Sequence, residues 1–271
     1  MKTQPVILIR GGGDLATGVA LRLHRVGAKV VITELQQPLV LRRTVAFAEA
    51  IYRGKHTVEG VTAHAVKDIE QAFIILATGE IPVLVDPNCQ FLDQLNPLVF
   101  VDARMTKRPP DFGMEAARFT IGLGPGFIAG ENCHAAIETN RGHFLARVIW
   151  DGSPQINTKL PEAVDQHQAE RVLRAPADGL IQTKVEIGHW VKSNELIAEV
   201  AGLQIRAPFE GRIRGIIHSG ILVGEGLKIG DIDPREDDRY VDLVSEKALA
   251  IGGGVLEAIF SQPDLRPFLW D

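Results

Sequence analysis

The chain has 271 residues, of which 45% are hydrophobic and 23% charged, a balance typical of a folded globular protein rather than a disordered or fibrous one. Its formal net charge of -5 argues against a sequence-independent nucleic-acid binder, because such proteins need a basic surface that displaces phosphate counterions. No stretch reaches the roughly 18 apolar residues of a membrane span, and no signal-peptide pattern follows Met1. We therefore expect a cytoplasmic protein whose partners include neither nucleic acid nor membrane.

Glycine is over-represented: 27 of the 271 residues are glycine, about a tenth of the chain, whereas ~7% is usual. The glycines gather at residues 11–13, 122–130 and 252–254. Clusters of this kind mark tight turns, close backbone approaches or ligand loops, so each of the three needs an explanation.

The chain begins with a short apolar strand, a glycine turn at residues 11–13, an amphipathic helix and a second strand that ends near Glu34. Within this unit, Gly11, Gly13 and Ala16 match the G-x-G-x-x-G/A fingerprint of dinucleotide-binding folds. In that fingerprint a phosphate approaches the backbone amides at the helix N-terminus. The pattern predicts a Rossmann-like nucleotide-binding domain.

Two acidic residues flank the glycine turn. Glu34 follows Gly13 by 21 residues, where a carboxylate bonds a ribose hydroxyl and favours a free 2'-OH over a 2'-phosphate. Asp14, directly after the glycines, would stabilise the helix dipole but repel a pyrophosphate. A ligand other than NAD, and a turn that serves packing alone, both stay open as alternatives.

Continuous apolar runs at residues 82–86, 98–102 and 119–122 predict further strands of a parallel sheet that is buried on both faces. In such sheets, ligands bind beyond the carboxyl ends of the strands, so the loops there would bring basic side chains close to the glycine turn. A solvated basic loop is the alternative. The predicted cofactor-binding residues are Gly11, Gly12, Gly13, Asp14, Glu34, Asp102, Arg104, Lys107, Arg108, Gly122, Gly124 and Gly126.

Arg42 and Arg43 are a second basic candidate, at the start of a helix-like run, for which we expect a surface position. Cys133 beside His134 offers a candidate reactive thiol, although free cysteines are commonly buried. With only two cysteines, a disulfide framework and a four-thiolate zinc site are excluded. Four further side chains have metal-ligand chemistry but no ligand spacing, so no metal site is predicted: Glu131, His134, Glu138 and His143.

The second half contains an internal repeat. Arg174-Ala-Pro-x-x-Gly179 recurs as Arg206-Ala-Pro-x-x-Gly211, at an offset of 32 residues. This pattern resembles the biotinyl/lipoyl-like barrel. Covalent carriage of biotin or lipoate is not expected, because no lysine lies between Lys192 and Lys228.

The expected fold class is therefore α/β, with a Rossmann-like parallel sheet domain followed by a small biotinyl/lipoyl-like β barrel-sandwich domain and a C-terminal helical segment. The expected boundaries are residues 1–150, a linker over 151–172, residues 173–235 for the β domain and residues 236–271 for the helical segment. The glycines at 252–254 would mark a helix break or a site of close packing.

Five motifs, in this order along essentially the whole chain, resemble the YqeB family. They lie at Arg10–Arg25, Gly122–Cys133, Ile137–His143, Lys228–Arg235 and Lys247–Glu257. Proteins of that family are regarded as accessory factors of selenium-dependent molybdenum hydroxylases, related to XdhC-type maturation proteins through the nucleotide-binding domain. The resemblance implies no catalytic residues. It makes Cys133, at the family's Asn-Cys position, a hypothesis for a chalcogen-handling thiol.

The leading hypothesis is thus a maturation factor for a selenium-dependent molybdenum hydroxylase that binds a molybdopterin-type cofactor or dinucleotide. Its partners would be the hydroxylase or other maturation proteins and a small nucleotide ligand, with a homo-oligomer also open. An NAD(H)-linked oxidoreductase is the first alternative, with NAD as cofactor and His134 or Asp102 as proton-transfer group. A non-catalytic interaction protein, whose glycine loops merely pack, is the second.

Overall fold

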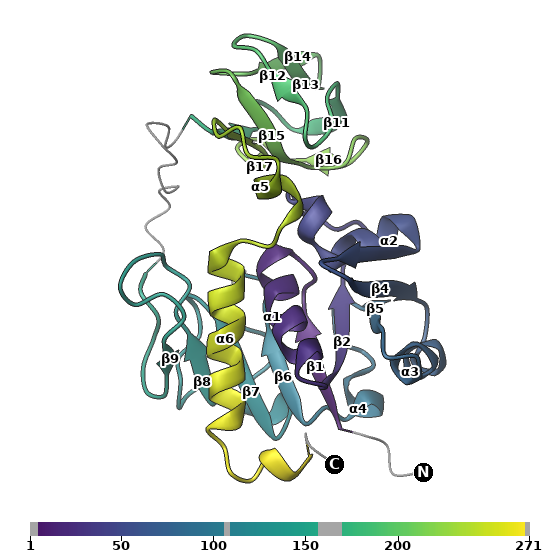
Figure 1. Cartoon of the computed structure of the whole chain (residues 1–271), viewed down its shortest axis with the longest axis vertical. Coiled ribbons are helices and arrows are strands. Elements are labelled where there is room, and N and C mark those ends of the chain that lie inside the picture. Colours follow the sequence, from purple (N-terminus) through teal and green to yellow (C-terminus); the bar gives the residue numbers. More distant parts are fainter. Residues whose placement is uncertain (1–4, 106–108, 157–169, 269–271) are drawn as a thin grey trace. The chain divides into compact units, whose positions relative to one another are not determined.

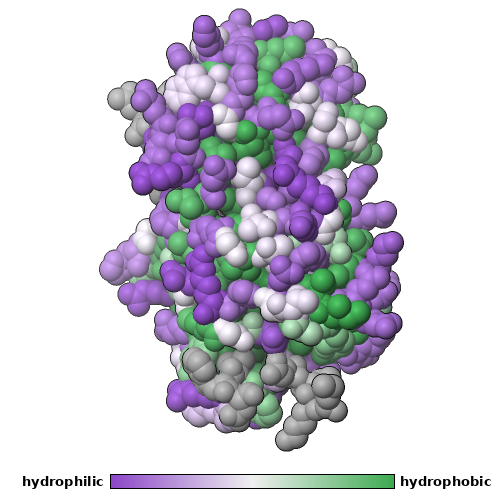
Figure 2. Space-filling model, turned by 45° about the vertical axis from the view of Figure 1, so that its right-hand side comes forward, coloured by the Kyte–Doolittle hydropathy of each residue, from purple (hydrophilic) through white to green (hydrophobic). Residues whose placement is uncertain are grey.

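The computed structural model describes residues 5–105, 109–156 and 170–268, which divide into two compact units. Unit 1 comprises residues 1–38, 46–157 and 244–271, and unit 2 comprises residues 39–45 and 158–243. Among the described residues, no helix is both long and apolar enough to cross a membrane. Hydrophilic side chains prevail on the face shown in Figure 2, with hydrophobic side chains between them.

Unit 1 is built on one nine-stranded sheet. Its strands are β1 (Val6–Arg10), β2 (Lys29–Glu34), β3 (Lys55–Val58), β4 (Val61–Val66), β5 (Ile81–Val85), β6 (Val99–Asp102), β7 (Phe119–Leu123), β8 (Ala135–Ile137) and β9 (Val148–Ile149). Across the sheet they run in the order β3-β4-β5-β2-β1-β6-β7-β8-β9. β1 and β6 are apolar except for their last residues, Arg10 and Asp102, and both strands are buried along their whole length, which places them in the core.

Helices cover this sheet. They are α1 (Asp14–Arg25), α2 (Ala50–Arg53), α3 (Ile69–Ala77), α4 (Leu92–Leu95) and α6 (Glu246–Phe260), with short 3-10 turns at Phe47–Glu49, Met114–Ala116 and Arg266–Phe268. α3 and α4 pack with Val6, Leu8 and Phe100 in one hydrophobic cluster. Figure 1 shows α1 and α6 lying side by side along the sheet.

The expected Rossmann-like parallel sheet followed by a biotinyl/lipoyl-like barrel-sandwich is wrong, because the sheet of unit 1 is mixed. β3 pairs antiparallel with β4, and β9 pairs antiparallel with β8. The first of these pairs is a hairpin whose two turn residues, Glu59 and Gly60, have φ of 45° and 82°. A two-residue turn with both φ positive returns the chain antiparallel to itself. The short, polar β3 carries no continuous apolar run, so the sequence pattern did not predict it.

Unit 2 consists of two four-stranded antiparallel sheets, with the orders β10-β17-β15-β12 and β14-β13-β11-β16. The strands are β10 (Val172–Arg174), β11 (Gly179–Thr183), β12 (Trp190–Val191), β13 (Leu196–Val200), β14 (Leu203–Arg206), β15 (Gly211–Ile216), β16 (Leu222–Val223) and β17 (Lys228–Asp233), followed by the short helix α5 (Arg239–Asp242).

The repeat of 32 residues relates β11 to β15, β12 to β16 and β13 to β17. The two copies interlock, because each sheet takes two strands from the first copy and two from the second. Neither copy of the repeat completes a sheet alone.

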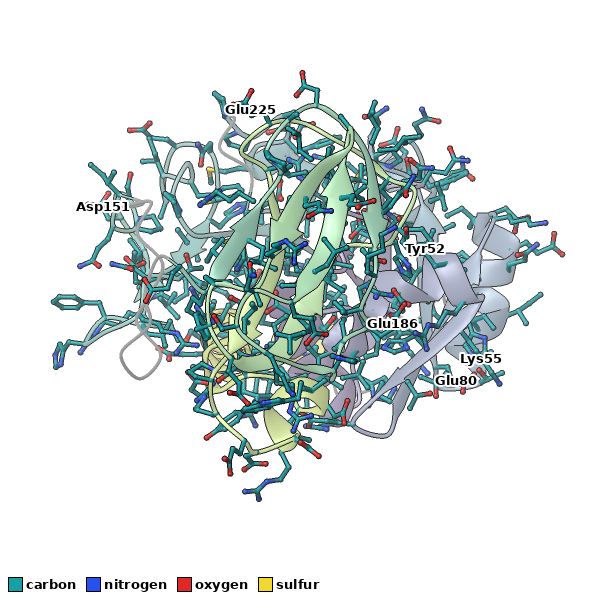
Figure 3. The ribbon with its side chains drawn as sticks, turned by 90° about the horizontal axis from the view of Figure 1, so that it is seen from above. Tyr52, Lys55, Glu80, Asp151, Glu186 and Glu225 are labelled. Carbon is teal, nitrogen blue, oxygen red and sulfur yellow. The ribbon has the colours of Figure 1, made fainter. Side chains whose placement is uncertain are left out.

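Residues 39–45 belong to unit 2, although they lie between β2 and α2 in the sequence, and we call them the strap. The Ile216 N–H donates to the Leu41 carbonyl at 3.0 Å, and Arg43 Nε donates to the Ile216 carbonyl at 2.8 Å. Arg43 also forms an ion pair with Glu186, labelled in Figure 3, at 3.2 Å. Arg42 and Arg43 are buried, contrary to the expected surface position, because the strap packs against β15.

Helix α6 is continuous through Gly252, Gly253 and Gly254, so the glycines do not break it. Ser245 caps the helix, with its side-chain oxygen accepting a hydrogen bond from the Ala248 N–H. A Cβ atom on Gly254 would lie 2.4 Å from the Ala146 carbonyl oxygen. Of the two explanations for these glycines, close packing is therefore the one that the structure supports.

Candidate functional site

The carboxyl ends of three neighbouring parallel strands meet at one edge of the sheet of unit 1. In the register of β1, Arg10 stands opposite Thr33 of β2 on one side and opposite Asp102 of β6 on the other. The glycine turn, Glu34 and Arg104 follow directly from these positions. The parallel register therefore brings together residues that lie up to about a third of the chain apart.

The glycine turn connects β1 to α1 and is closely packed. Gly11 has φ of 95° and donates its N–H to the Thr33 carbonyl at 2.8 Å. A Cβ atom on Gly12 would lie 2.9 Å from the Ala48 backbone nitrogen, which itself donates to the Gly12 carbonyl at 2.9 Å. α1 then begins at Asp14, and no side chain caps it at Gly13. The N-cap thus contributes no side-chain hydrogen bond, and the acidic residue in the first turn of the helix is Asp14.

Glu34 lies across this turn. Its carboxylate accepts hydrogen bonds from the Gly12 N–H and the Leu35 N–H, both at 2.7 Å. Burial raises the pKa of Glu34 above its ordinary value, against these two hydrogen bonds, which lower it. A carboxylate has about four lone-pair positions, so Glu34 keeps acceptor capacity for a ligand hydroxyl.

Arg104 joins the site from the loop after β6. Its guanidinium contacts both carboxylate oxygens of Asp102, the shortest contact being 2.6 Å from Nη2 to Oδ2, and also Asp111 at 2.7 Å. A Cβ atom on Gly11 would lie 3.3 Å from Cγ of Arg104, so the arginine lies directly against the glycine turn. Burial lowers the pKa of Arg104, but hydrogen bonds and charge attraction from Asp102 and Asp111 raise it overall.

Arg10 is a member of this cluster that the sequence pattern did not reveal. Its guanidinium makes two parallel contacts with Asp111, at 2.6 and 2.9 Å, and a third with the Pro87 carbonyl at 2.6 Å. The Phe112 ring lies 4.9 Å from its central carbon. The available signal was a charged residue at the end of an otherwise apolar strand, because a buried charge needs a specific partner.

The second glycine loop reaches the same region. A Cβ atom on Gly124, which has φ of 76°, would lie 3.0 Å from the Met105 side chain and 2.6 Å from Thr139 Oγ1. The Phe127 ring fills the space over Gly122. The Gly126 carbonyl accepts a hydrogen bond from the Asn132 side chain at 3.3 Å. Protein side chains therefore fill the space over Gly122 and Gly124, whereas Gly126 is exposed, and Gly124 lies next to the loop of Arg104.

Cys133 is fully buried in a small cluster with Phe127, Ala129 and Ala136. Burial raises the pKa of its thiol to about 11, against backbone hydrogen bonds from Gly122 and Ile128 that lower it. The thiol is thus protonated at neutral pH, which is the opposite of an activated nucleophile. The neighbouring His134 accepts a hydrogen bond at Nδ1 from the Thr120 N–H at 2.9 Å, and burial lowers its pKa.

Other residues that the sequence singled out either lie outside the described part of the chain or take no part in this cluster. Lys107 and Arg108 lie outside the described residues. Glu138 accepts hydrogen bonds from the Asn140 and Gln155 N–H groups at 2.6 and 2.7 Å. Within the described part of the chain, no three histidine, cysteine or acidic side chains converge to hold a metal ion.

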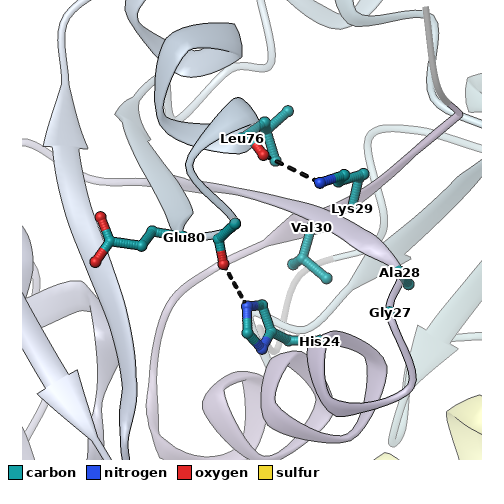
Figure 4. A pocket seen from close by; sticks show the side chains of 8 residues that line it. His24, Gly27, Ala28, Lys29, Val30, Leu76 and Glu80 are labelled. Carbon is teal, nitrogen blue, oxygen red and sulfur yellow. Dashed lines mark hydrogen bonds between the residues drawn. The ribbon is translucent and has the colours of Figure 1, made fainter.

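A separate hollow of about 160 Å³ lies near the amino end of β2, where Lys29 begins that strand (Figure 4). His24 Nε2 donates to the Gly79 carbonyl at 2.8 Å, and Lys29 Nζ donates to the Leu76 carbonyl at 3.1 Å. Lys29 thus satisfies a carbonyl group in the last turn of α3, and His24 satisfies one just beyond the end of that helix. Glu34, by contrast, is the last residue of β2, so this hollow is not part of the site around the glycine turn.

No protein-family model matches the chain. A curated relative from Escherichia coli (strain K12), the uncharacterized protein YqeB, is 48% identical over 254 residues, which cover 94% of this chain. The chain is a homologue of YqeB. The chain spans 47% of the length of that relative, so no activity of the whole YqeB protein is assigned to it.

Several solved structures also resemble the chain at low similarity. The product-bound ectoine utilization protein EutE (DoeB) from Ruegeria pomeroyi is 12% identical, with a TM-score of 0.26 over 84% of this chain and 85% of that one. An aspartoacylase family protein from Mesorhizobium loti is 8% identical, with a TM-score of 0.27 over 84% of each chain. A succinylglutamate desuccinylase/aspartoacylase from Rhodobacter sphaeroides is 13% identical, with a TM-score of 0.28 over 84% and 85%.

These comparisons correct the expected function. The expectation of a maturation factor for a selenium-dependent molybdenum hydroxylase is withdrawn: the YqeB relative is uncharacterized, and none of the solved structures named above is a molybdenum maturation protein. The NAD(H)-linked oxidoreductase and the pure interaction protein are set aside with it. At TM-scores below 0.3, the likeness does not carry the activity of those neighbours over to this homologue of YqeB. The cofactor and the partners stay predictions.

Proposed function

We propose that unit 1 binds a nucleotide or another ligand with a diphosphate group at the carboxyl ends of β1, β2 and β6. The observation that carries this proposal is the convergence of three features at one edge of the sheet. These are the glycine turn at the uncapped start of α1, the buried carboxylate of Glu34 and the guanidinium of Arg104.

Each feature has a distinct part in this binding. The start of α1 attracts a phosphate through its backbone N–H groups and the helix dipole. Arg104 supplies a planar set of donors that matches a phosphate, and it lies against Gly11. Glu34 has spare lone pairs that would accept a ribose hydroxyl. A dinucleotide such as NAD, or a simple nucleoside diphosphate, carries both groups.

Titration calorimetry with NAD, ADP and inorganic pyrophosphate tests the proposal. Saturable binding of at least one of them, with a dissociation constant of about 1 mM or tighter, is expected, since this corresponds to about 4 kcal/mol. Gly13 has φ of -66°, which any residue adopts, so Gly13→Val keeps the backbone and places a side chain where the phosphate would lie.

The matched control is Gly253→Ala, at a glycine of unit 1 whose added Cβ meets no atom within 4 Å. The control retains wild-type binding, whereas Gly13→Val abolishes it. Absence of saturable binding for all three probes, or equal binding by wild type and Gly13→Val, contradicts the proposal.

A further inference from the structure

We propose that Arg10 and Arg104 together form a phosphate-binding subsite, and that the carboxylate of Asp111 occupies this subsite until a ligand displaces it. The inference rests on the proposed function, because the subsite adjoins the same glycine turn. It adds Arg10 to the site, names the chemical group that the two arginines recognise, and assigns Asp111 the role of an internal competitor.

The first observation is that one carboxylate joins two arginines from different segments. Asp111 Oδ1 accepts from Arg10 Nη1 at 2.6 Å and from Arg104 Nη2 at 2.7 Å, while Oδ2 accepts from Arg10 Nη2 at 2.9 Å. Two guanidinium groups that converge on one oxyanion form the arrangement that proteins use for phosphate and carboxylate recognition.

The second observation is an asymmetry in burial. The Arg10 side chain is 2% exposed, and its Nε, which is buried, has no hydrogen-bond partner. The Asp111 side chain is 54% exposed and belongs to a segment without regular secondary structure. Arg10 is thus fixed at the buried end of β1, whereas the Asp111 carboxylate is more than half exposed, so a ligand can reach and displace it from the solvent side.

The third observation concerns the charge that remains without Asp111. Arg104 keeps its contacts with Asp102, which is 2% exposed and lies only two residues away in the sequence. Among the described residues that hydrogen-bond to the two guanidinium groups, Asp102 would then be the single carboxylate. Because a buried arginine without an anionic partner is costly, a ligand phosphate would take the place of the displaced carboxylate.

The subsite also lies beside the glycine turn, since a Cβ atom on Gly11 would lie 3.3–3.4 Å from Cγ and backbone atoms of Arg104. A carboxylate that belongs to the same chain competes with a free ligand at a high effective concentration. Asp111 therefore weakens the binding of every ligand that uses the two arginines, and its removal strengthens binding.

The test compares pyrophosphate binding by wild type, Asp111→Asn and Asp264→Asn in titration calorimetry. Asp111→Asn keeps the shape of the side chain and removes its charge, and we expect pyrophosphate to bind roughly tenfold more tightly, as for the loss of one charge-assisted contact. Asp264 is the matched control, because it is a 56% exposed aspartate of unit 1 in an ion pair with Arg118, and Asp264→Asn leaves the affinity unchanged.

The outcomes separate this inference from the proposed function. Pyrophosphate binding that is equal or weaker in Asp111→Asn overturns the competitor role and leaves the proposed function standing. The dicarboxylate malonate is titrated as a second probe. If Asp111→Asn binds malonate more tightly than wild type does but shows no gain for pyrophosphate, the assignment of this subsite to phosphate is overturned. If neither protein binds pyrophosphate or a nucleotide, the proposed function fails and the inference fails with it.

If Asp111→Asn does not fold, displacement of Asp111 can still be tested on the wild-type protein. The carboxyl carbon of Asp111 is followed by NMR at neutral pH while pyrophosphate is added. Displacement from two arginines changes its chemical shift in a saturable manner. A resonance that does not move while pyrophosphate binds overturns the inference.

Discussion

Gly18 of α1 and Gly252 of α6 touch backbone to backbone. A Cβ atom on Gly252 would lie 2.6 Å from the Gly18 carbonyl oxygen, and one on Gly18 would lie 2.4 Å from the Ala248 carbonyl oxygen. Two helices cross at such short range only where side chains are absent from both. The pair therefore joins the C-terminal helix to the first helix of unit 1, although the two residues are separated by most of the chain.

Replacement of Gly252 by alanine should destabilise unit 1 by about 1–3 kcal/mol, the usual cost of overpacking. The added methyl group meets backbone atoms of Gly18, which cannot turn away as a flexible side chain could. Chemical denaturation measures the change. Gly253→Ala is the control, because its Cβ meets nothing, and it should stabilise α6 by up to about 1 kcal/mol through helix propensity. Equal stability of the two variants would contradict the packing argument.

The pH dependence of stability should carry a contribution from Glu34. Burial raises its pKa above 4.5, so the folded protein holds this proton more tightly than the unfolded chain does. The corresponding stability is complete below pH 4.5 and is lost as the pH rises through the folded-state pKa. Denaturation curves between pH 4 and 7 should therefore show a shallower decline for Glu34→Gln than for wild type. An unchanged decline would show that Glu34 does not titrate as inferred.

The Cys133 thiol should be nearly inert in the folded protein. Its pKa of about 11, against an ordinary value of 9.0, lowers the thiolate fraction at neutral pH by about a hundredfold, and burial also blocks access. Labelling with a thiol reagent in a Cys89→Ala background reports on Cys133 alone. We expect slow labelling in buffer and rapid labelling in denaturant. Rapid labelling of the folded protein would restore Cys133 as a candidate nucleophile.

The strap should be sensitive to a single methyl group on β15. A Cβ atom on Gly215 would lie 2.9 Å from the Leu41 carbonyl oxygen, so Gly215→Ala should push the strap away and break the hydrogen bond from Ile216 to Leu41. A loss of about 1–3 kcal/mol in the stability of unit 2 is expected, together with faster proteolysis within residues 39–45. Gly224→Ala, whose Cβ has an ordinary 3.6 Å contact with Asp178, is the matched control. Equal proteolysis of both variants would contradict this role of the strap.

Part of the fold could be predicted from local patterns. The strands expected at residues 82–86, 98–102 and 119–122 are β5, β6 and β7, displaced by one residue at most. Continuous apolar runs made them visible, because these strands are buried on both faces. The edge strands β3 and β9 escaped prediction, since a short strand at an edge is stabilised by its pairing partner more than by its own composition.

The candidate site, too, could be predicted only in part. The fingerprint of Gly11 and Gly13 indicated where a turn and a helix begin, and the parallel register explains why Arg104 lies beside them. Asp111 and Arg10 could not be paired from the sequence, because they lie 101 residues apart and no motif contains both of them. The same holds for Arg42 and Arg43, whose burial depends on β15 of unit 2.

The sequence by itself determined the local elements of this protein, namely the buried strands, the glycine turn before α1 and the repeat of 32 residues. These features depend on neighbouring residues and on periodicity, which act over a few positions of the chain. Only the tertiary structure decided that the sheet is mixed, that α6 runs unbroken through three glycines and that Asp111 fills the space between two arginines. Those outcomes depend on contacts between distant segments, where packing and charge pairing outweigh the local preferences of each residue.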